Sequence, residues 1–329
     1  MTASDTPLQR DTRAVVLRTL LLDAVAARSA GLLAERGVPC ILLKGRVLAN
    51  WLYADEVRDY GDVDLLVPPA LRDDAVDVLG SVGYRHRLAG AAPAEYGTNE
   101  LELVGPNGVC IDLHHTLLGV PAAQCWAVLS QHTEQMTVGG RSLTVLAPGA
   151  RALHLALHVA QNGPVDVKAV HDLELGLARL PLDLWRDARD LAEAAGATPA
   201  FAAGLYAVEA GGRLAGRLDL LPPRDVALQL RTTSAPQQAL QIQNFVEAGS
   251  LRSRAGLVAR KLWPTRIYML GRLPAARAGT TALLTARLRR LAGLPHTFFI
   301  AFRSWYRAMR AVRALPAGHV HVGHEKELV

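Results

Sequence analysis

Hydrophobic residues in the first part of the chain recur with helical spacing and then gather in short apolar runs. Residues 8–36 carry apolar side chains at roughly the period of a helix: Leu8, Val15, Val16, Leu20, Val25, Leu32 and Leu33. Gly37 should end this helix and Pro39 prevents its continuation. The pattern then predicts a buried strand at 41–43, a helix at 46–53, a strand at 63–67 and a helix at 70–80.

The middle of the chain changes from strand signals to helix signals. Alternating residues predict strands at 84–88, 100–104 and 109–114, and Gly105-Pro106-Asn107-Gly108 predicts a hairpin between the last two. A short helix is expected at 125–129 and a second hairpin at 135–145. From Pro148 onward the periodicity is helical, with helices expected at 149–161, 165–179, 182–195 and 198–211. The predicted fold class is therefore α+β, followed by an all-helical C-terminal half.

Composition places the chain among ordinary globular proteins. It has 329 residues, of which 50% are hydrophobic and 20% are charged, so disorder and fibrous repeats are not expected. The uncharged stretch Leu291–Phe302 has only 12 residues, fewer than the about 20 that a membrane-spanning helix needs. The N-terminal segment is polar and carries Asp5 and Asp11, which is unlike a secretory signal. With three dispersed cysteines, these features predict a cytoplasmic protein without a transmembrane segment.

Charge is distributed unevenly along the chain. Residues 1–250 hold 21 Lys and Arg against 28 Asp and Glu, whereas residues 251–313 hold 14 basic residues and no acidic one. We call residues 251–313 the basic tail. Its aromatic residues and arginines could contact nucleic acid, an anionic lipid surface or an acidic protein, or the tail could pack on the acidic body. We expect three parts: an α+β domain at 1–147, a helical domain at 148–250, and a basic, largely helical segment at 251–329.

Two acidic residues on one predicted strand are the first candidate for chemistry. In a strand, Asp62 and Asp64 project from the same face, about 6.6 Å apart. Asp112, on the later strand 109–114, would add a third carboxylate if the two strands lie side by side. Three carboxylates can hold two Mg²⁺ ions about 3.5–4 Å apart, which suits phosphoryl or nucleotidyl transfer. The alternative is a set of solvated loop acids.

A second candidate precedes these acids. The strand 41–43 leads into Lys44-Gly45-Arg46, which opens a helix. Glycine permits close approach of a phosphate to the backbone, and Lys44 and Arg46 add positive charge. An ordinary helix start with two surface bases is the alternative.

The order of these motifs resembles that of a known superfamily. The segment ILLKGRVLANWLYADEVRDYGDVDLLV, followed by GYR and VCIDLHH, resembles the polymerase-β-type nucleotidyltransferases, and more closely their uncharacterised bacterial nucleotidyltransferase family. The resemblance implies a small mixed nucleotidyltransferase sheet with flanking helices. By position it makes Gly45 the glycine of the phosphate turn, Asp62 and Asp64 the paired metal ligands, Asp112 the third carboxylate and Arg58 the arginine ahead of them.

The resemblance also extends to the helices and has two departures. It makes His158 and Asp172 candidates for lining the nucleotide or acceptor cleft. Independently of the resemblance, His114 would orient the carboxylate of Asp112 if the two share a face of the strand, and the alternative is an edge residue. The wider superfamily has Ser or Gly where Arg46 follows Gly45, and its spacing to the acidic pair is shorter. His154 and His158 lie four residues apart as zinc ligands can, but we expect hydrogen-bonded histidines of a core or interface.

These observations predict an enzyme. It would move an NMP from an NTP, with ATP the expected nucleotide, to an acceptor and release pyrophosphate, using two Mg²⁺ ions. The acceptor could be a small molecule, a peptide, a protein or RNA. The alternative is a catalytically degenerate nucleotide-binding or regulatory protein that works through its basic C-terminal surface.

Overall fold

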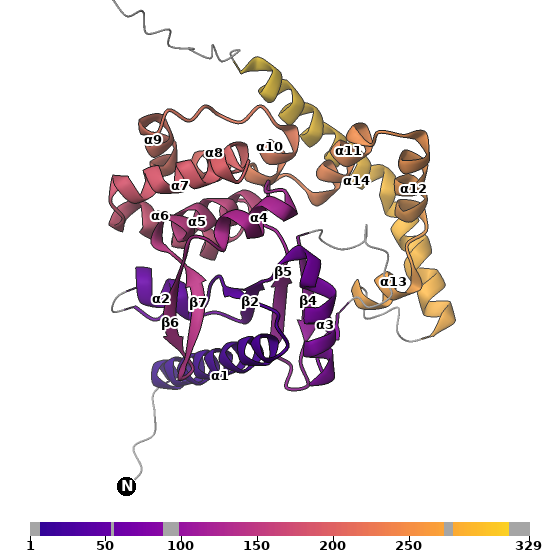
Figure 1. Cartoon of the computed structure of the whole chain (residues 1–329). Helices are drawn as coiled ribbons and strands as arrows, with labels where there is room; N and C mark the ends of the chain where they lie inside the picture. The colour runs from indigo at the N-terminus through magenta and orange to yellow at the C-terminus, as the bar shows by residue number, and fades with distance from the viewer. Residues whose placement is uncertain (1–6, 54–55, 88–98, 273–278, 316–329) are drawn as a thin grey trace, which may run out of the picture.

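The computed structural model describes residues 7–53, 56–87, 99–272 and 279–315 (Figure 1). Its centre is a mixed seven-stranded sheet in the order β3-β4-β5-β2-β1-β7-β6. The strands are β1 (Ile41–Leu42), β2 (Asp62–Leu66), β3 (Arg85–His86), β4 (Glu100–Val104), β5 (Cys110–His114), β6 (Thr133–Val138) and β7 (Arg141–Leu146). The predicted α+β class, with a mixed sheet and a helical second half, is confirmed.

Strand pairing decides which side chains meet. Strands β2 and β5 are parallel neighbours, in a register that sets Asp64 opposite Asp112. Strands β4 and β5 form the predicted antiparallel hairpin, in which Glu100 lies opposite His114. Gly108 adopts a φ of 78° in the connecting turn, a conformation that glycine reaches without strain. Two strands distant in sequence thus present their side chains at one place.

Helices cover the sheet in two layers. Helices α1 (Pro7–Glu35), below the sheet in Figure 1, and α3 (Arg72–Ser81), beside β4 there, share a core with Val63 and Leu65 of β2. Helix α5 (Pro148–Asn162) lies on the opposite face, where it shares the other core with Leu66. Because side chains alternate along a strand, Asp62 and Asp64 project to the α5 side together with Leu66.

The second half of the chain is helical, as predicted. Its elements up to residue 250 are α5, α6 (Val167–Arg179), α7 (Leu182–Ala194), α8 (Thr198–Tyr206), α9 (Glu209–Arg217), α10 (Val226–Thr232) and α11 (Gln237–Glu247), whereas α4 (Ala122–Leu129) lies earlier, between β5 and β6. The single helix expected at 198–211 is wrong, because Val208 is extended, with φ −127° and ψ 144°, and separates α8 from α9. This break buries Val208 in the core and brings Gly211 against the carbonyl of Leu205.

The basic tail forms α12 (Leu251–Leu262), α13 (Arg266–Arg272) and α14 (Thr280–Ala314). Ala301 and Ala308 of α14 pack with Leu230 of α10 and Ala239 of α11 in a small separate core. None of the helices in the described ranges combines the length and apolar composition that a bilayer crossing requires. The division at 147 and 250 stays a prediction, and α5 shares its core with residues of the sheet.

Candidate active site

Three carboxylates line one pocket between the sheet and the helices. Asp62 and Asp64 come from β2 and Asp112 from β5, and all three line a cavity of about 180 Å³. Neighbouring strands lie about 4.8 Å apart, so the register that pairs Asp64 with Asp112 sets their Cα atoms at about that distance. The acids that the sequence singled out are therefore adjacent in space, although 48 residues separate Asp64 from Asp112.

The three carboxylates differ in their electrostatic surroundings. Burial raises the pKa of Asp62, and the neighbouring charge of Asp64 raises it further. Burial and the negative charges of Asp64, Glu100 and Asp62 raise the pKa of Asp112 to about 7. Burial acts on Asp64 in the same direction, but Lys44 and His114 outweigh it and hold the pKa of Asp64 well below its usual range. The pocket thus stabilises the charge of one carboxylate and leaves that of the other two poorly neutralised.

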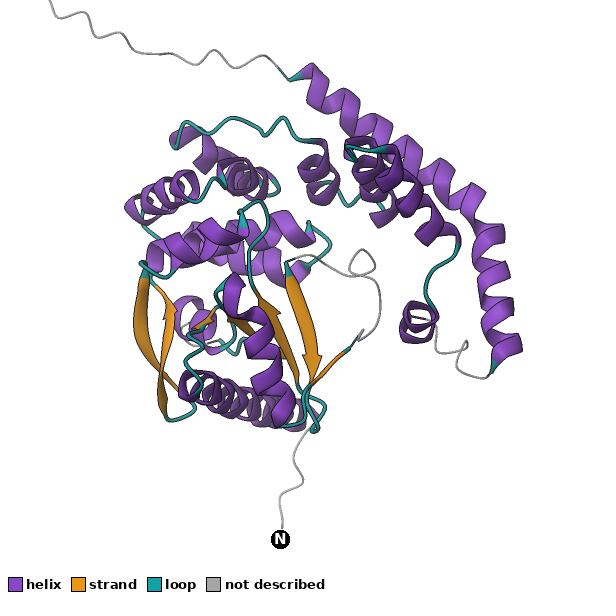
Figure 2. Cartoon of the chain, turned by 45° about the vertical axis from the view of Figure 1, so that its right-hand side comes forward, coloured by secondary structure: helices purple, strands orange, loops and turns teal. Residues whose placement is uncertain are grey.

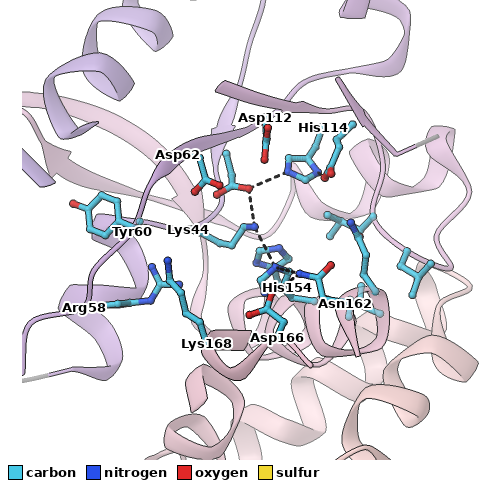
Figure 3. Close-up of a pocket in the computed structure, with 18 residues that line it drawn as sticks. Lys44, Arg58, Tyr60, Asp62, Asp112, His114, His154, Asn162, Asp166 and Lys168 are labelled. Atoms are coloured by element: carbon cyan, nitrogen blue, oxygen red, sulfur yellow. Dashed lines mark hydrogen bonds and ion pairs between the residues drawn. The ribbon is translucent and has the colours of Figure 1, made fainter. Parts of the chain in front are cut away.

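Lys44 links the sheet to helix α5. Its Nζ lies 2.7 Å from Asp64 Oδ1 and 3.3 Å from His158 Nε2. In Figure 3, Lys44 extends between the carboxylates of the strands and the side chains of the helix. The Nδ2 of Asn162 is 3.0 Å from the same His158 nitrogen, and because an ammonium and an amide NH₂ nitrogen only donate, Nε2 must accept. His158 therefore carries its proton on Nδ1 in this arrangement.

Both histidines of α5 face this ammonium. Burial first, and then the charge of Lys44, lower the pKa of His154 to about 3 and that of His158 well below its usual value. Their rings stack with centroids 6.0 Å apart. Neutral imidazoles follow from this placement, and both side chains line the pocket rather than only the core.

His114 orients Asp64 rather than Asp112. Its Nε2 is 3.1 Å from Asp64 Oδ1, and its Nδ1 is 3.3 Å from Glu100 Oε2 without the angles of a hydrogen bond. Asp112 and His114 lie two residues apart on β5 and therefore share a face of the strand, and both line the pocket. The carboxylate that it contacts belongs to the neighbouring strand, because β2 and β5 run parallel with Leu66 opposite His114.

Arg58 is fixed beneath the acids by a buried ion pair. Its Nε and Nη2 donate to Oδ1 and Oδ2 of Asp172 at 2.9 and 2.6 Å, and the hydroxyl of Tyr53 donates to Asp172 Oδ1 at 2.6 Å. The side chains of Arg58 and Asp172 are 3% and 1% exposed. Nη1 of Arg58 is buried and has no hydrogen-bond partner among the described residues, while Arg58 lines the pocket. Asp172 holds Arg58 in place, and the pocket wall itself does not include Asp172.

The phosphate turn predicted at residues 44–46 is built around a glycine. Gly45 has a φ of 66°, and a Cβ there would lie 3.3 Å from the ring of Tyr60. Tyr60 donates its hydroxyl to Asp23 of α1 at 2.6 Å, and Arg46 binds the other oxygen of Asp23 with Nε at 2.7 Å. Lys44 and Gly45 therefore line the pocket, whereas Arg46 is held by α1 and is not among the lining residues.

The pocket has one wall from the sheet and one from the helices. The lining residues with titratable or amide side chains are Lys44, Arg58, Tyr60, Asp62, Asp64, Glu100, Asp112, His114, His154, His158, Gln161, Asn162, Asp166 and Lys168. Figure 3 shows Asp62, Asp112 and His114 on one side and His154, Asn162, Asp166 and Lys168 on the other. Asp166 accepts from Asn162 at 2.7 Å and caps α6 through the amide of Ala169 at 3.0 Å.

Sequence reasoning missed Glu100, Asn162, Asp166 and Lys168. The hairpin register could have found Glu100, because counting back from the Gly105–Gly108 turn sets it opposite His114. The break at Asn162-Gly163-Pro164, followed by an aspartate that caps a helix, marks the corner that brings the other three to the pocket.

The oxygen ligands fit a divalent cation, although the described side chains do not form a ready ligand set. Among the described residues, no group of three His, Cys, Asp or Glu side chains is arranged to hold a metal ion as it stands. Asp64 forms an ion pair with Lys44, so an ammonium group, and not a metal ion, neutralises its charge. The carboxylates of Asp62 and Asp112 repel each other when ionised, and hard oxygen donors of this kind are what Mg²⁺ prefers.

Three solved structures resemble the chain slightly. The solution structure of the antibiotic-resistance factor ANT(2'')-Ia is 17% identical, over 56% of this chain and 91% of that one, with a TM-score of 0.37. A crystal structure of ANT(2'')-Ia in complex with adenylyl-2''-tobramycin is 14% identical, over 55% and 98%, with a TM-score of 0.35. The CCA-adding enzyme of Thermotoga maritima complexed with tRNA is 10% identical, over 89% and 81%, with a TM-score of 0.25. Likenesses this weak identify neither a substrate nor a reaction.

Comparison by sequence identifies the family. No curated protein sequence matches the chain. The sequence model of the family described as uncharacterised nucleotidyltransferase matches residues 4–210, which is more than half of the 329 residues and includes every residue that lines the pocket. The chain therefore belongs to this nucleotidyltransferase family.

Proposed function

We propose that the protein is a Mg²⁺-dependent nucleotidyltransferase that moves an NMP from an NTP, with ATP the expected nucleotide, to an acceptor. The observation that carries the proposal is the juxtaposition of Asp62, Asp64 and Asp112 on two adjacent parallel strands beside Lys44. Three acids from separate segments at one pocket are costly unless a cation neutralises them. Family membership agrees with this reaction class.

The reaction needs one bond to form and one to break at the α-phosphorus. The acceptor oxygen or nitrogen attacks the α-phosphorus, and the bond from that phosphorus to the bridging oxygen breaks, so pyrophosphate leaves. Asp112 takes the proton of the acceptor, while Asp62 and Asp64 supply metal-binding oxygens. Bound Mg²⁺, one or two ions, would neutralise charge on the phosphates and carboxylates. His114 orients Asp64 for this role through its Nε2.

The basic residues of the pocket would bind the triphosphate. Arg58 presents a buried Nη1 with no partner among the described residues, while Asp172 fixes the rest of its guanidinium. A phosphate oxygen would satisfy that donor. Lys44 sits between Asp64 and His158, within reach of the same space, and Gly45 lets a phosphate approach the backbone. Arg46 stays at Asp23 and strengthens the turn rather than the nucleotide contact.

The test measures pyrophosphate release and transfer together. Purified protein is incubated with Mg²⁺ and each of the four NTPs, with candidate acceptors or a small-molecule extract, and products are read by mass. Asp64→Asn should reduce transfer by more than about 10³-fold, because it removes a negative charge at the metal site. Asp73→Asn is the matched control, since Asp73 is 84% exposed on α3 and lies outside the pocket. Turnover by Asp64→Asn at the wild-type rate would overturn the proposal.

A nucleotide-binding protein without turnover is the second candidate. It is favoured by the Lys44–Asp64 ion pair, which places an ammonium where the catalyst needs a metal. Calorimetry distinguishes the two. The enzyme should bind NTP more tightly with Mg²⁺ than with EDTA and lose that difference in Asp64→Asn, whereas a binding protein should show no difference.

A further inference from the structure

One face of helix α14 packs against neighbouring helices, and the rest of its surface is exposed to solvent. Ala301, Ala308 and Val312 are buried against the rest of the helical region, and Trp305 donates its Nε1 to Gln243 of α11 at 2.7 Å. These four positions share one face of the helix, since they are spaced three to four residues apart. Figures 1 and 2 show α14 at the outer edge of the molecule, remote from the sheet, so its other side faces outward.

A continuous apolar stripe runs along the exposed surface of α14, beside the packed face, where Phe302 lies 5.6 Å from Trp305 between ring centroids. Its members recur at helical spacing over 22 residues, about 33 Å of helix: Leu284, Leu288, Pro295, Phe299, Phe302 and Tyr306. Phe298 lies at the edge of this row and is 60% exposed, and Phe299 is 67% exposed. We call the six residues of the row and Phe298 together the apolar stripe. Large aromatic groups held in water at this density indicate a surface that is covered in use.

A row of arginines lies beside the stripe. Arg289, Arg303, Arg307 and Arg310 are exposed and follow one another around the adjoining face of α14. Nothing in the basic tail opposes them, because residues 251–313 contain no Asp or Glu. The other two arginines in the first half of α14 are engaged within the tail.

Those two arginines are structural. Arg287 stacks over Trp263 at 4.5 Å and donates to the carbonyl of Pro264, and Arg290 donates to the carbonyl of Lys261. They fasten α14 to the segment that precedes it. The arginines that remain for a partner are those beside the apolar stripe.

We propose that α14 docks the protein on an anionic lipid surface, with the apolar stripe at the level of the acyl chains and the arginine row on the headgroups. A helix with a large apolar face and a purely basic polar flank has this chemistry. Each arginine near a negatively charged bilayer adds attraction, and the stripe adds burial of apolar area. The surface lies outside residues 4–210, which the family match covers, and does not depend on the proposed reaction.

Two other occupants fit the surface less well. Base stacking needs free ring faces, whereas Phe302 already lies against Phe298 and Tyr306 at centroid distances of 6.0 and 6.3 Å, and Leu284, Leu288 and Pro295 offer no aromatic ring. A second copy meeting the same face would bring two rows of arginines together, with no acidic residue in the basic tail to neutralise them. An anionic lipid surface offers acyl chains to the apolar stripe and negatively charged headgroups to the arginine row.

The test is sedimentation of the full chain with vesicles. We expect binding to vesicles of phosphatidylcholine with 30% phosphatidylglycerol and none to phosphatidylcholine alone. Arg303→Glu with Arg307→Glu should weaken binding by more than about tenfold. Phe298→Ala with Phe299→Ala should weaken it to a similar degree and leave the unfolding midpoint unchanged, since both side chains project into water.

Matched controls lie elsewhere on the surface. Arg36→Glu with Arg217→Glu makes the same charge change at exposed sites off the tail, and Leu17→Ala with Leu221→Ala removes exposed apolar groups there. Both should bind vesicles nearly as the wild type does. The proposal fails if anionic vesicles are not bound, or if the controls weaken binding as much as the α14 variants. It also fails if the wild type binds single-stranded RNA more tightly than vesicles and the Phe298→Ala and Phe299→Ala substitutions do not change vesicle binding.

Discussion

Asp112→Asn should stabilise the metal-free protein, and the gain should grow with pH. The folded state raises the pKa of Asp112 from 3.8 to about 7, first through burial and then through the charges of Asp64, Glu100 and Asp62. A carboxyl whose pKa is raised by folding favours the folded state least when it is ionised. The stability that protonated Asp112 gives the folded state is therefore lost as pH rises from about 4 through about 7. The full shift corresponds to about 4 kcal/mol. Because the carboxylate lines a pocket that water can enter, we expect about 1–3 kcal/mol at pH 8.

Urea unfolding in EDTA from pH 4.5 to 8.5 measures the effect. The difference in unfolding free energy between Asp112→Asn and the wild type should be small at pH 4.5 and largest above pH 7.5. Asp73→Asn on the surface of α3 should show no such trend. Adding Mg²⁺ at pH 8 should stabilise the wild type more than Asp112→Asn. A difference that is constant with pH, or a wild type that gains stability between pH 5 and 8 relative to the variant, would refute the reasoning.

Two further predictions concern the supports of the site. Asp172→Ala should cost about 3–5 kcal/mol in urea unfolding, because it leaves the guanidinium of Arg58 buried without its counterion. Arg58→Leu combined with Asp172→Leu should recover most of that stability but still fail to bind NTP in calorimetry; a double variant that binds NTP normally would contradict the role of Arg58. Gly45→Ala should cost about 1–2 kcal/mol and weaken NTP binding, because a side chain disfavours a φ of 66° and would press on Tyr60. Gly61→Ala is its control, since a Cβ there would contact nothing within 4 Å, and equal losses in both variants would argue against the special geometry of the turn.

Local patterns predicted most of the fold. The strands at 100–104 and 109–114 and their hairpin follow from alternation and from the Gly105–Gly108 turn, both of which act over a few residues. The break at Val208 could not be predicted in this way. The residues around it have helical periodicity. The chain turns there because Val208 is buried in the core and Gly211 lies against the carbonyl of Leu205.

The acids of the site could also be placed from sequence, but their partners could not. Alternation along each strand predicts that Asp62 and Asp64 share one face of their strand, opposite to that of Val63, and that Asp112 lies opposite to Ile111 on its own strand. Which basic group reaches them depends on packing across the whole domain. Lys44 meets His158, 114 residues later, only because α5 covers the sheet. Arg46 looks like a phosphate ligand in the sequence, yet Asp23 of α1, 23 residues earlier, engages it.

The distribution of charge in the pocket argues for a nucleotide that arrives with its own cation. Lys44 is paired with Asp64 and Arg58 with Asp172 before a ligand enters, and Lys168 is the third basic side chain that lines the pocket. Burial and neighbouring carboxylates raise the pKa of Asp62 and Asp112, and an unaccompanied triphosphate would raise them further, because its charge repels the ionised carboxylates. A triphosphate that carries Mg²⁺ brings positive charge to the two acids and offers phosphate oxygens to Arg58 and Lys44. We therefore expect NTP and Mg²⁺ to bind cooperatively, each raising the affinity for the other by the same factor, because linkage requires that reciprocity.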